Sequence, residues 1–299
     1  MAKKKVLIIG LDGVSWDLLE TLFGKGLLPT LKKIKENGVH GILESTIPPV
    51  TGPAWVSFAT GKNPGKHGIY DFIQPKKSLS NLKPVTSRDI RSITFYELLE
   101  KAGKRCILIN LPVTYPPRIK GITITSLMTS GDNFVFPRSL KEEIPELKNY
   151  RITPNNALLA KGKFKEYIQD VRRLENVKFR VAQELFKRDW DLFFILFSGT
   201  DWINHAIYDK LLENDEEDES VREAFAFYQD IDKYIKWFVE NSPLNKFNVG
   251  FAYDIPAFFK LSNSEQNIFG NFGDESSPKS SINREKTRIN PFFQKKNHS

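Results

Sequence analysis

The sequence has little cysteine and histidine and no long run of apolar residues. Its 299 residues include one cysteine, Cys106, and four histidines. A single cysteine cannot form an internal disulfide, and we interpret Cys106, which stands in the apolar stretch CILIN, as a small buried side chain. No apolar run approaches the roughly 18 residues of a membrane-spanning helix, and the run 6–11 is too short for the core of a signal peptide. We therefore expect a soluble, cytoplasmic protein without a membrane span.

The positive charge of the chain is concentrated near its C-terminal end. The formal net charge is +8, from 44 Lys and Arg against 36 Asp and Glu. Residues 276–299 carry six basic side chains and one acidic one, a net charge of +5, so the first 275 residues hold the remaining +3. A basic segment with little aromatic interleaving is typical of a solvated, disordered end, and polyanion binding is the weaker alternative. We predict no specific nucleic-acid partner.

Apolar runs of strand length alternate with helical patterns along the first 245 residues. Each predicted strand is a nearly continuous apolar run, as is typical of buried parallel strands. Residues 115–160 contain several prolines and little periodicity, and we interpret them as an excursion of loops and short elements that caps the sheet. We expect an α/β fold with a mainly parallel sheet and helices on both faces. Strands are predicted at 6–11, 105–111 and 191–198, and helices at 14–23, 29–37, 53–60, 93–102, 163–185 and 221–241.

Polar residues stand at the ends of two predicted strands and at the start of a helix. Asp12 follows the first strand, and Thr51, in the stretch IPPVTGPAW, falls at or near a helix N-cap. Asp201 and His205 are four residues apart after the strand 191–198, so a helix beginning at Asp201 would place both on one face. Because ligand sites in open parallel sheets lie beyond the carboxyl ends of the strands, these residues could converge. Taken singly, each is more often a turn residue, a capping residue or a chance spacing than part of a site.

Four long motifs together are similar to one known family. These are VLIIGLDG, STIPPVTGPAWVSFATGKNPGKHGIYDF, VTSRDIRSITFYELLEKAGKRCILINLPVTYPP and FSGTDWINHAIYD. In order and spacing they resemble the type I phosphodiesterase and nucleotide pyrophosphatase branch of the alkaline phosphatase superfamily, from about Lys4 to Asn245. The resemblance implies that residues 1–245 form part of an alkaline-phosphatase-like catalytic domain whose C-terminal part is missing. Residues 246–299 match nothing in the family and are expected to be a disordered basic tail.

The resemblance also implies a chemistry, the hydrolysis of small phosphate mono- or diesters at two divalent metal ions, usually Zn²⁺ or alternatively Mn²⁺. In the family a Thr or Ser attacks phosphorus, and Thr51 occupies that position of the motif. Asp12 matches the ligand that shares one metal with Thr51, and Asp201 and His205 match two ligands of the other. His67 belongs to the motif without being a ligand in the family, so we interpret it as structural.

The sequence departs from the family pattern at two places. Ala54 stands where many nucleotide pyrophosphatases carry an asparagine, which argues against that activity here. Later, the family has a strand that ends in Asp-His-Gly and a further histidine downstream, whereas this chain has Asp254 followed by Ile255 and no histidine before His298. Each metal would then keep two protein ligands, fewer than the three of a catalytic zinc. The alternative is therefore a catalytically incomplete, truncated or frame-shifted family member.

Overall fold

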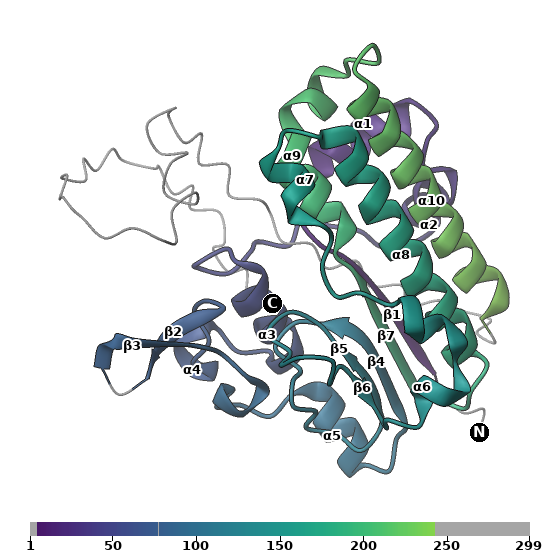
Figure 1. Cartoon of the computed structure of the whole chain (residues 1–299). Helices are drawn as coiled ribbons and strands as arrows, with labels where there is room; N and C mark the ends of the chain where they lie inside the picture. Colours follow the sequence, from purple (N-terminus) through teal and green to yellow (C-terminus); the bar gives the residue numbers. More distant parts are fainter. Residues whose placement is uncertain (1–4, 77, 243–299) are drawn as a thin grey trace, which may run out of the picture. The chain divides into compact units, whose positions relative to one another are not determined.

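A five-stranded sheet lies at the centre of the described part of the chain, which comprises residues 5–76 and 78–242 of a computed structural model (Figure 1). These residues belong to the first of two units into which the chain divides, Met1–Ala257. The strand order is β1-β7-β4-β5-β6, and only β6 runs antiparallel to its neighbour. The strands are β1 (Val6–Leu11), β7 (Leu192–Phe197), β4 (Cys106–Leu111), β5 (Ile122–Thr125) and β6 (Val135–Phe136).

Helices cover both faces of this sheet, and the side chains of β7 show why. Phe193, Ile195 and Phe197 belong to one buried cluster, whereas Leu192, Phe194 and Leu196 belong to another. Successive residues of a strand point to opposite faces, so an uninterrupted apolar run requires cover on both sides. On the first face lie α1 (Trp16–Gly24), α2 (Pro29–Asn37), α8 (Phe164–Phe186), α9 (Gly199–Glu213) and α10 (Glu219–Asn241), and on the second lie α3 (Thr51–Thr60) and α5 (Phe95–Lys101).

The long elements confirm the predictions from the apolar pattern to within a few residues. The three predicted strands are present, and α8 and α10 each have 23 residues. α2 begins at Pro29 and is followed by Gly38, as its boundary residues indicated. Cys106 is buried, as expected. None of the helices in residues 5–76 and 78–242 is long and apolar enough to cross a membrane.

The segment 115–160 differs from its interpretation as a cap. β5 and β6, both from this segment, extend the central sheet, and β5 pairs in parallel with β4. The sequence ITIT of β5 is short and half threonine, so it lacks the long apolar run by which the other parallel strands were recognised. The rest of the segment does form short elements: α6 (Leu140–Glu143), the 3₁₀ helix η2 (Pro145–Asn149) and α7 (Asn156–Ala160).

Four small elements follow α3. These are α4 (Pro64–His67), the antiparallel hairpin of β2 (Ile73–Lys76) and β3 (Ser78–Pro84), and the 3₁₀ helix η1 (Ser87–Asp89). The expected loss of regular structure after Asn245, the basic tail, Asp254 and His298 lie outside the described residues.

Candidate active site at the ends of β1 and β7

Asp12 lies where β1 ends, next to the first turn of α9. β1 and β7 are adjacent and parallel, so their carboxyl ends meet at one edge of the sheet. The backbone N–H of Asp12 donates to the carbonyl of Phe197 at 3.1 Å. The Thr200 hydroxyl donates to the carbonyl of Asp12 at 2.5 Å. The structure therefore brings together the two segments that carry Asp12 and Asp201.

α3 is attached to the end of β1 through Trp55. The indole N–H of Trp55 donates to Oδ1 of Asp12 at 2.9 Å, and Asp12 is only 2% exposed. Trp55 can reach this carboxylate because residue 10 is glycine: a Cβ there would lie 2.6 Å from the indole. Thr51 is the first helical residue of α3, one turn before Trp55, and the capping residue is Val50, with no side-chain cap bond. Thr51 thus lies near the N-cap, as expected, but is not itself the cap.

Asp201 and His205 form a close pair on α9, which begins two residues earlier than the sequence suggested, at Gly199. His205 Nε2 lies 3.2 Å from Asp201 Oδ1. Two ligands of a tetrahedral zinc, each about 2 Å from the ion, stand roughly 3.4 Å apart, so this separation suits one metal. The Asp201 side chain is 15% exposed and the His205 side chain 68%. The two side chains thus lie on one face of α9, close enough to each other to contact one ion.

Gly13 brings the loop after β1 against Asp201. Its φ is +64°, and a Cβ on it would lie 2.5 Å from Oδ1 of Asp201, so a larger residue would push the carboxylate away. The carbonyl of Gly13 accepts a hydrogen bond of 2.7 Å from the side-chain amide of Asn204, and the Asn204 Oδ1 accepts one of 2.7 Å from Tyr228. This bond network holds the Asp12 loop, α9 and α10 together.

The donor set fits a metal only in part. Asp201 and His205 suit two positions around one ion, yet residues 5–76 and 78–242 contain no group of three His, Cys, Asp or Glu side chains that could hold a metal. A catalytic zinc ordinarily has three protein ligands. The described residues therefore do not complete a metal site of this kind.

His67 is integrated into the protein interior. It is fully buried, its Nδ1 accepts the backbone N–H of Ile69 at 3.1 Å, and its Nε2 lies 2.9 Å from the hydroxyl of Ser57. An Nδ1 that accepts leaves the proton of the neutral ring on Nε2, which then donates to Ser57. Burial lowers the pKa of His67 and favours this neutral form. These contacts agree with a structural role. His40, by contrast, is exposed beside the ring of Trp16.

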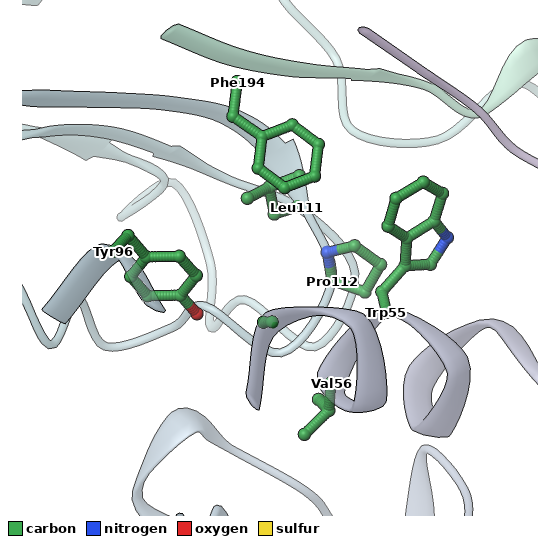
Figure 2. A pocket seen from close by; sticks show the side chains of 7 residues that line it. Trp55, Val56, Tyr96, Leu111, Pro112 and Phe194 are labelled. Carbon is green, nitrogen blue, oxygen red and sulfur yellow. The ribbon is translucent and has the colours of Figure 1, made fainter. Parts of the chain in front are cut away.

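A small apolar pocket lies between α3, α5 and the strands β4 and β7. Figure 2 shows Trp55, Val56, Tyr96, Leu111, Pro112 and Phe194 around it, and Ala59 completes the lining. None of the proposed metal ligands lines this pocket, and its walls offer no charge to a phosphate. It is an imperfection in the packing of α3 on the sheet and not the candidate site.

Some residues that support the site were missed from the sequence. Asn204 stands between two predicted ligands, but its partners Gly13 and Tyr228 are distant in sequence. Glu175 and Lys178 are fully buried on α8. A signal did exist for this pair, because both fall on the apolar face of α8, at the spacing of Val171, Leu174 and Val181.

This chain is similar to a known protein family and to proteins of solved structure. A family model described as type I phosphodiesterase/nucleotide pyrophosphatase matches residues 6–250. The structure of phosphonoacetate hydrolase from Sinorhizobium meliloti, with bound phosphonoacetate, is 18% identical over 80% of this chain and 54% of its own, with a TM-score of 0.51. That of murine ectonucleotide pyrophosphatase/phosphodiesterase 5 is 16% identical over 79% of this chain and 52% of its own, with a TM-score of 0.46. The chain thus spans about half the length of these solved proteins. No curated protein sequence matches.

Proposed function

Because this chain belongs to the type I phosphodiesterase/nucleotide pyrophosphatase family, a family of hydrolases within the alkaline phosphatase superfamily, we propose that it hydrolyses small phosphate mono- or diesters with Thr51 as the nucleophile. In this proposal Asp12 and Thr51 hold one divalent metal ion, and Asp201 and His205 hold another. Zn²⁺ or Mn²⁺ is the metal expected. The location in the cytoplasm expected from the sequence stays a prediction, which cell fractionation would test.

The observation that carries the proposal is the link between α3 and the end of β1. The bond from Trp55 to Asp12 attaches α3, one turn after Thr51, to the carboxylate that the family motif assigns to the same metal as Thr51, and this contact supports the proposal. A helix N-terminus favours the negative charge of a phosphoryl group, because backbone N–H groups point outward there. Bound divalent ions would stabilise negative charge on the attacking oxygen and on the phosphoryl oxygens. Thr51 attacks phosphorus, the ester alcohol leaves, and water then releases phosphate or the phosphomonoester from the threonine.

Ala54 argues against nucleotides as substrates. It occupies the position at which many nucleotide pyrophosphatases carry an asparagine that supports the phosphoryl oxygens. The methyl group of Ala54 can donate no hydrogen bond, and its backbone N–H is already bonded to the Val50 carbonyl at 3.0 Å. We therefore propose simple phosphate esters as substrates in preference to nucleotides.

Replacement of the nucleophile tests this proposal. With added Zn²⁺ or Mn²⁺, the protein is expected to hydrolyse p-nitrophenyl phosphate or bis(p-nitrophenyl) phosphate slowly, and Thr51→Ala to abolish that activity because the covalent step is lost. Thr51→Ser is expected to retain part of it. Thr60→Ala, which removes a hydroxyl at the other end of α3, serves as the matched control and is expected to be nearly as active as the unmodified protein. Hydrolysis that survives Thr51→Ala would refute the mechanism.

A second candidate is a catalytically incomplete family member. The partial donor set favours it, because two-ligand sites bind zinc weakly. Equilibrium dialysis with Zn²⁺ at pH 7 distinguishes the two. For the enzyme, Asp12→Ala and Asp201→Ala are each expected to remove about one bound ion and to reduce the rate. For the incomplete member, the unmodified protein is expected to bind no zinc at micromolar concentration and to hydrolyse neither ester.

A further inference from the structure

A fully buried ion pair lies directly beneath the first turn of α9. The side chains of Lys178 and Glu175 are 0% and 1% exposed. The Lys178 ammonium donates to Oε1 of Glu175 at 2.8 Å and lies equally close to Oε2. Removing two charges from water costs several kcal/mol per ion, and a buried pair often contributes no net stability. Its presence on the apolar face of α8 therefore calls for a reason other than stability.

The carboxylate of Glu175 is bonded to the backbone of α9. The N–H of Gly199, the first residue of that helix, donates to Oε1 of Glu175 at 2.7 Å. Such first-turn N–H groups have no partner within their own helix, so a buried one needs an acceptor from elsewhere. Glycine is required here, because a Cβ at residue 199 would lie 2.8 Å from the Glu175 side chain. The contact thus ties the start of α9 to α8.

Lys178 also approaches α9, at the residue next to Asp201. Its Nζ lies 5.7 Å from the ring centre of Trp202, the neighbour of Asp201. Burial lowers the pKa of Lys178, while the negative charges of Glu175 and Asp12 act in the opposite direction. The contact of 2.8 Å between Lys178 Nζ and Glu175 provides the counter-charge for a buried carboxylate at residue 175.

We propose that Glu175, with Lys178 as its charge partner, is a positioning residue of the candidate site: it anchors Gly199 and so holds Asp201 against Gly13 and beside His205. Asp201 is two residues from the anchored N–H, and its carboxylate lies so close to Gly13 that a Cβ at residue 13 would be 2.5 Å from it. That Asp201 and His205 bind metal rests on the proposed function. The anchoring of α9 by Glu175 does not depend on the proposed function.

Two double variants distinguish the effect of the hydrogen bond to Gly199 from the effect of the buried charges. Glu175→Gln with Lys178→Met and Glu175→Leu with Lys178→Met both remove the ion pair and keep similar volume. They differ in one respect, because only the glutamine can still accept the N–H of Gly199. If the leucine variant does not fold, Glu175→Asn with Lys178→Met replaces it. The asparagine side chain is one methylene shorter, so its amide does not reach the N–H of Gly199. Circular dichroism and thermal melting establish that each variant is folded.

The readouts are hydrogen exchange at the Gly199 amide and the affinity for Zn²⁺ at pH 7. We expect Gly199 to be protected in the unmodified protein and in the glutamine variant, and to exchange faster in the leucine or asparagine variant. Zinc affinity is expected to fall about 10-fold or more in the same variants and to stay unchanged with glutamine, as is usual when a residue that orients a ligand is removed. Unchanged protection of Gly199, or lost protection with unchanged zinc affinity, would overturn the proposal. If the unmodified protein binds no zinc, the proposed function fails, and the Gly199 exchange alone decides whether Glu175 is the anchor.

Discussion

At the scale of single residues, burial distinguishes the histidines more clearly than the sequence motif does. His67 and His205 both stand in family-like stretches, yet His67 is fully enclosed and bonded through both ring nitrogens, whereas the His205 side chain is 68% exposed beside a carboxylate. A buried imidazole that bonds as a neutral ring supports the fold. The exposure of His205 is compatible with the role proposed for it as a metal ligand.

His67 should make the stability of the protein depend on pH. Its pKa is lowered from 6.5 by burial in the folded state, so below about pH 6.5 the unfolded chain binds more protons and the free energy of unfolding falls as the pH falls. His67→Gln removes this contribution. We expect it to cost about 1–3 kcal/mol at pH 7.5 through lost hydrogen bonds, and less at pH 5.5. Urea unfolding at both pH values measures the difference. His40→Gln, an exposed control, is expected to leave the pH dependence unchanged, and an equal cost of His67→Gln at both pH values would contradict the argument.

At the scale of elements, the packing of α3 against β1 determines where Thr51 lies. Trp55 crosses from α3 to Asp12 over Gly10, and its ring also packs near Phe194, with centroids 6.1 Å apart. The glycine next to the end of β1 is thus required by the approach of another element. The position of the candidate nucleophile depends on this contact as well as on its own sequence motif.

Gly10→Ala tests that dependence. The new methyl group would lie 2.6 Å from the Trp55 ring and 2.7 Å from Leu196, so one of them must move. We expect a loss of about 1–3 kcal/mol in the free energy of unfolding, as is typical of overpacking, and a change in near-UV circular dichroism from the displaced indole. The control is Gly24→Ala at the end of α1, where a Cβ meets nothing within 4 Å and stability is expected to stay the same or rise slightly. Equal effects of the two substitutions would show that Gly10 is not constrained by Trp55.

The elements that the sequence predicted share one property, which is that their pattern is local. β1, β4 and β7 are six-residue apolar runs, and the stripe of α8 repeats over 23 residues. β5 and β6 are only four and two residues long, and their pairing depends on neighbours that a local pattern does not contain. The residues of the candidate site likewise include some that a local pattern predicts and some that it does not. Asp12 and Asp201 could be predicted because strand ends meet at one edge of the sheet. The anchoring of Gly199 by Glu175 could not, because it joins residues 24 positions apart on different elements.

At the scale of the whole described unit, β7 contributes side chains to two hydrophobic cores, one on each face of the sheet. Phe193 points into the cluster with α8, α9 and α10, where it meets Phe186 at 4.9 Å between ring centres. Phe194 points into the cluster with α3 and α5, where its ring lies 5.6 Å from that of Phe58. Neither core can be disturbed without moving the strand that also forms the other. The candidate site lies at the end of this strand, so its geometry depends on both cores.

Phe193→Ala and Phe194→Ala should therefore weaken the same cooperative structure. Each leaves a cavity beside β7, and we expect each to reduce the free energy of unfolding by about 3–5 kcal/mol. Hydrogen exchange measured by mass spectrometry is expected to accelerate in α3 and in α8 together in both variants, because opening either core releases the common strand. Leu98→Ala on α5, whose side chain is half exposed, is the control and is expected to change stability by less than about 0.5 kcal/mol. If each phenylalanine variant accelerated exchange only on its own side of the sheet, the two cores would be independent. The link from α3 through Trp55 to Asp12 would then be too weak to maintain a common site.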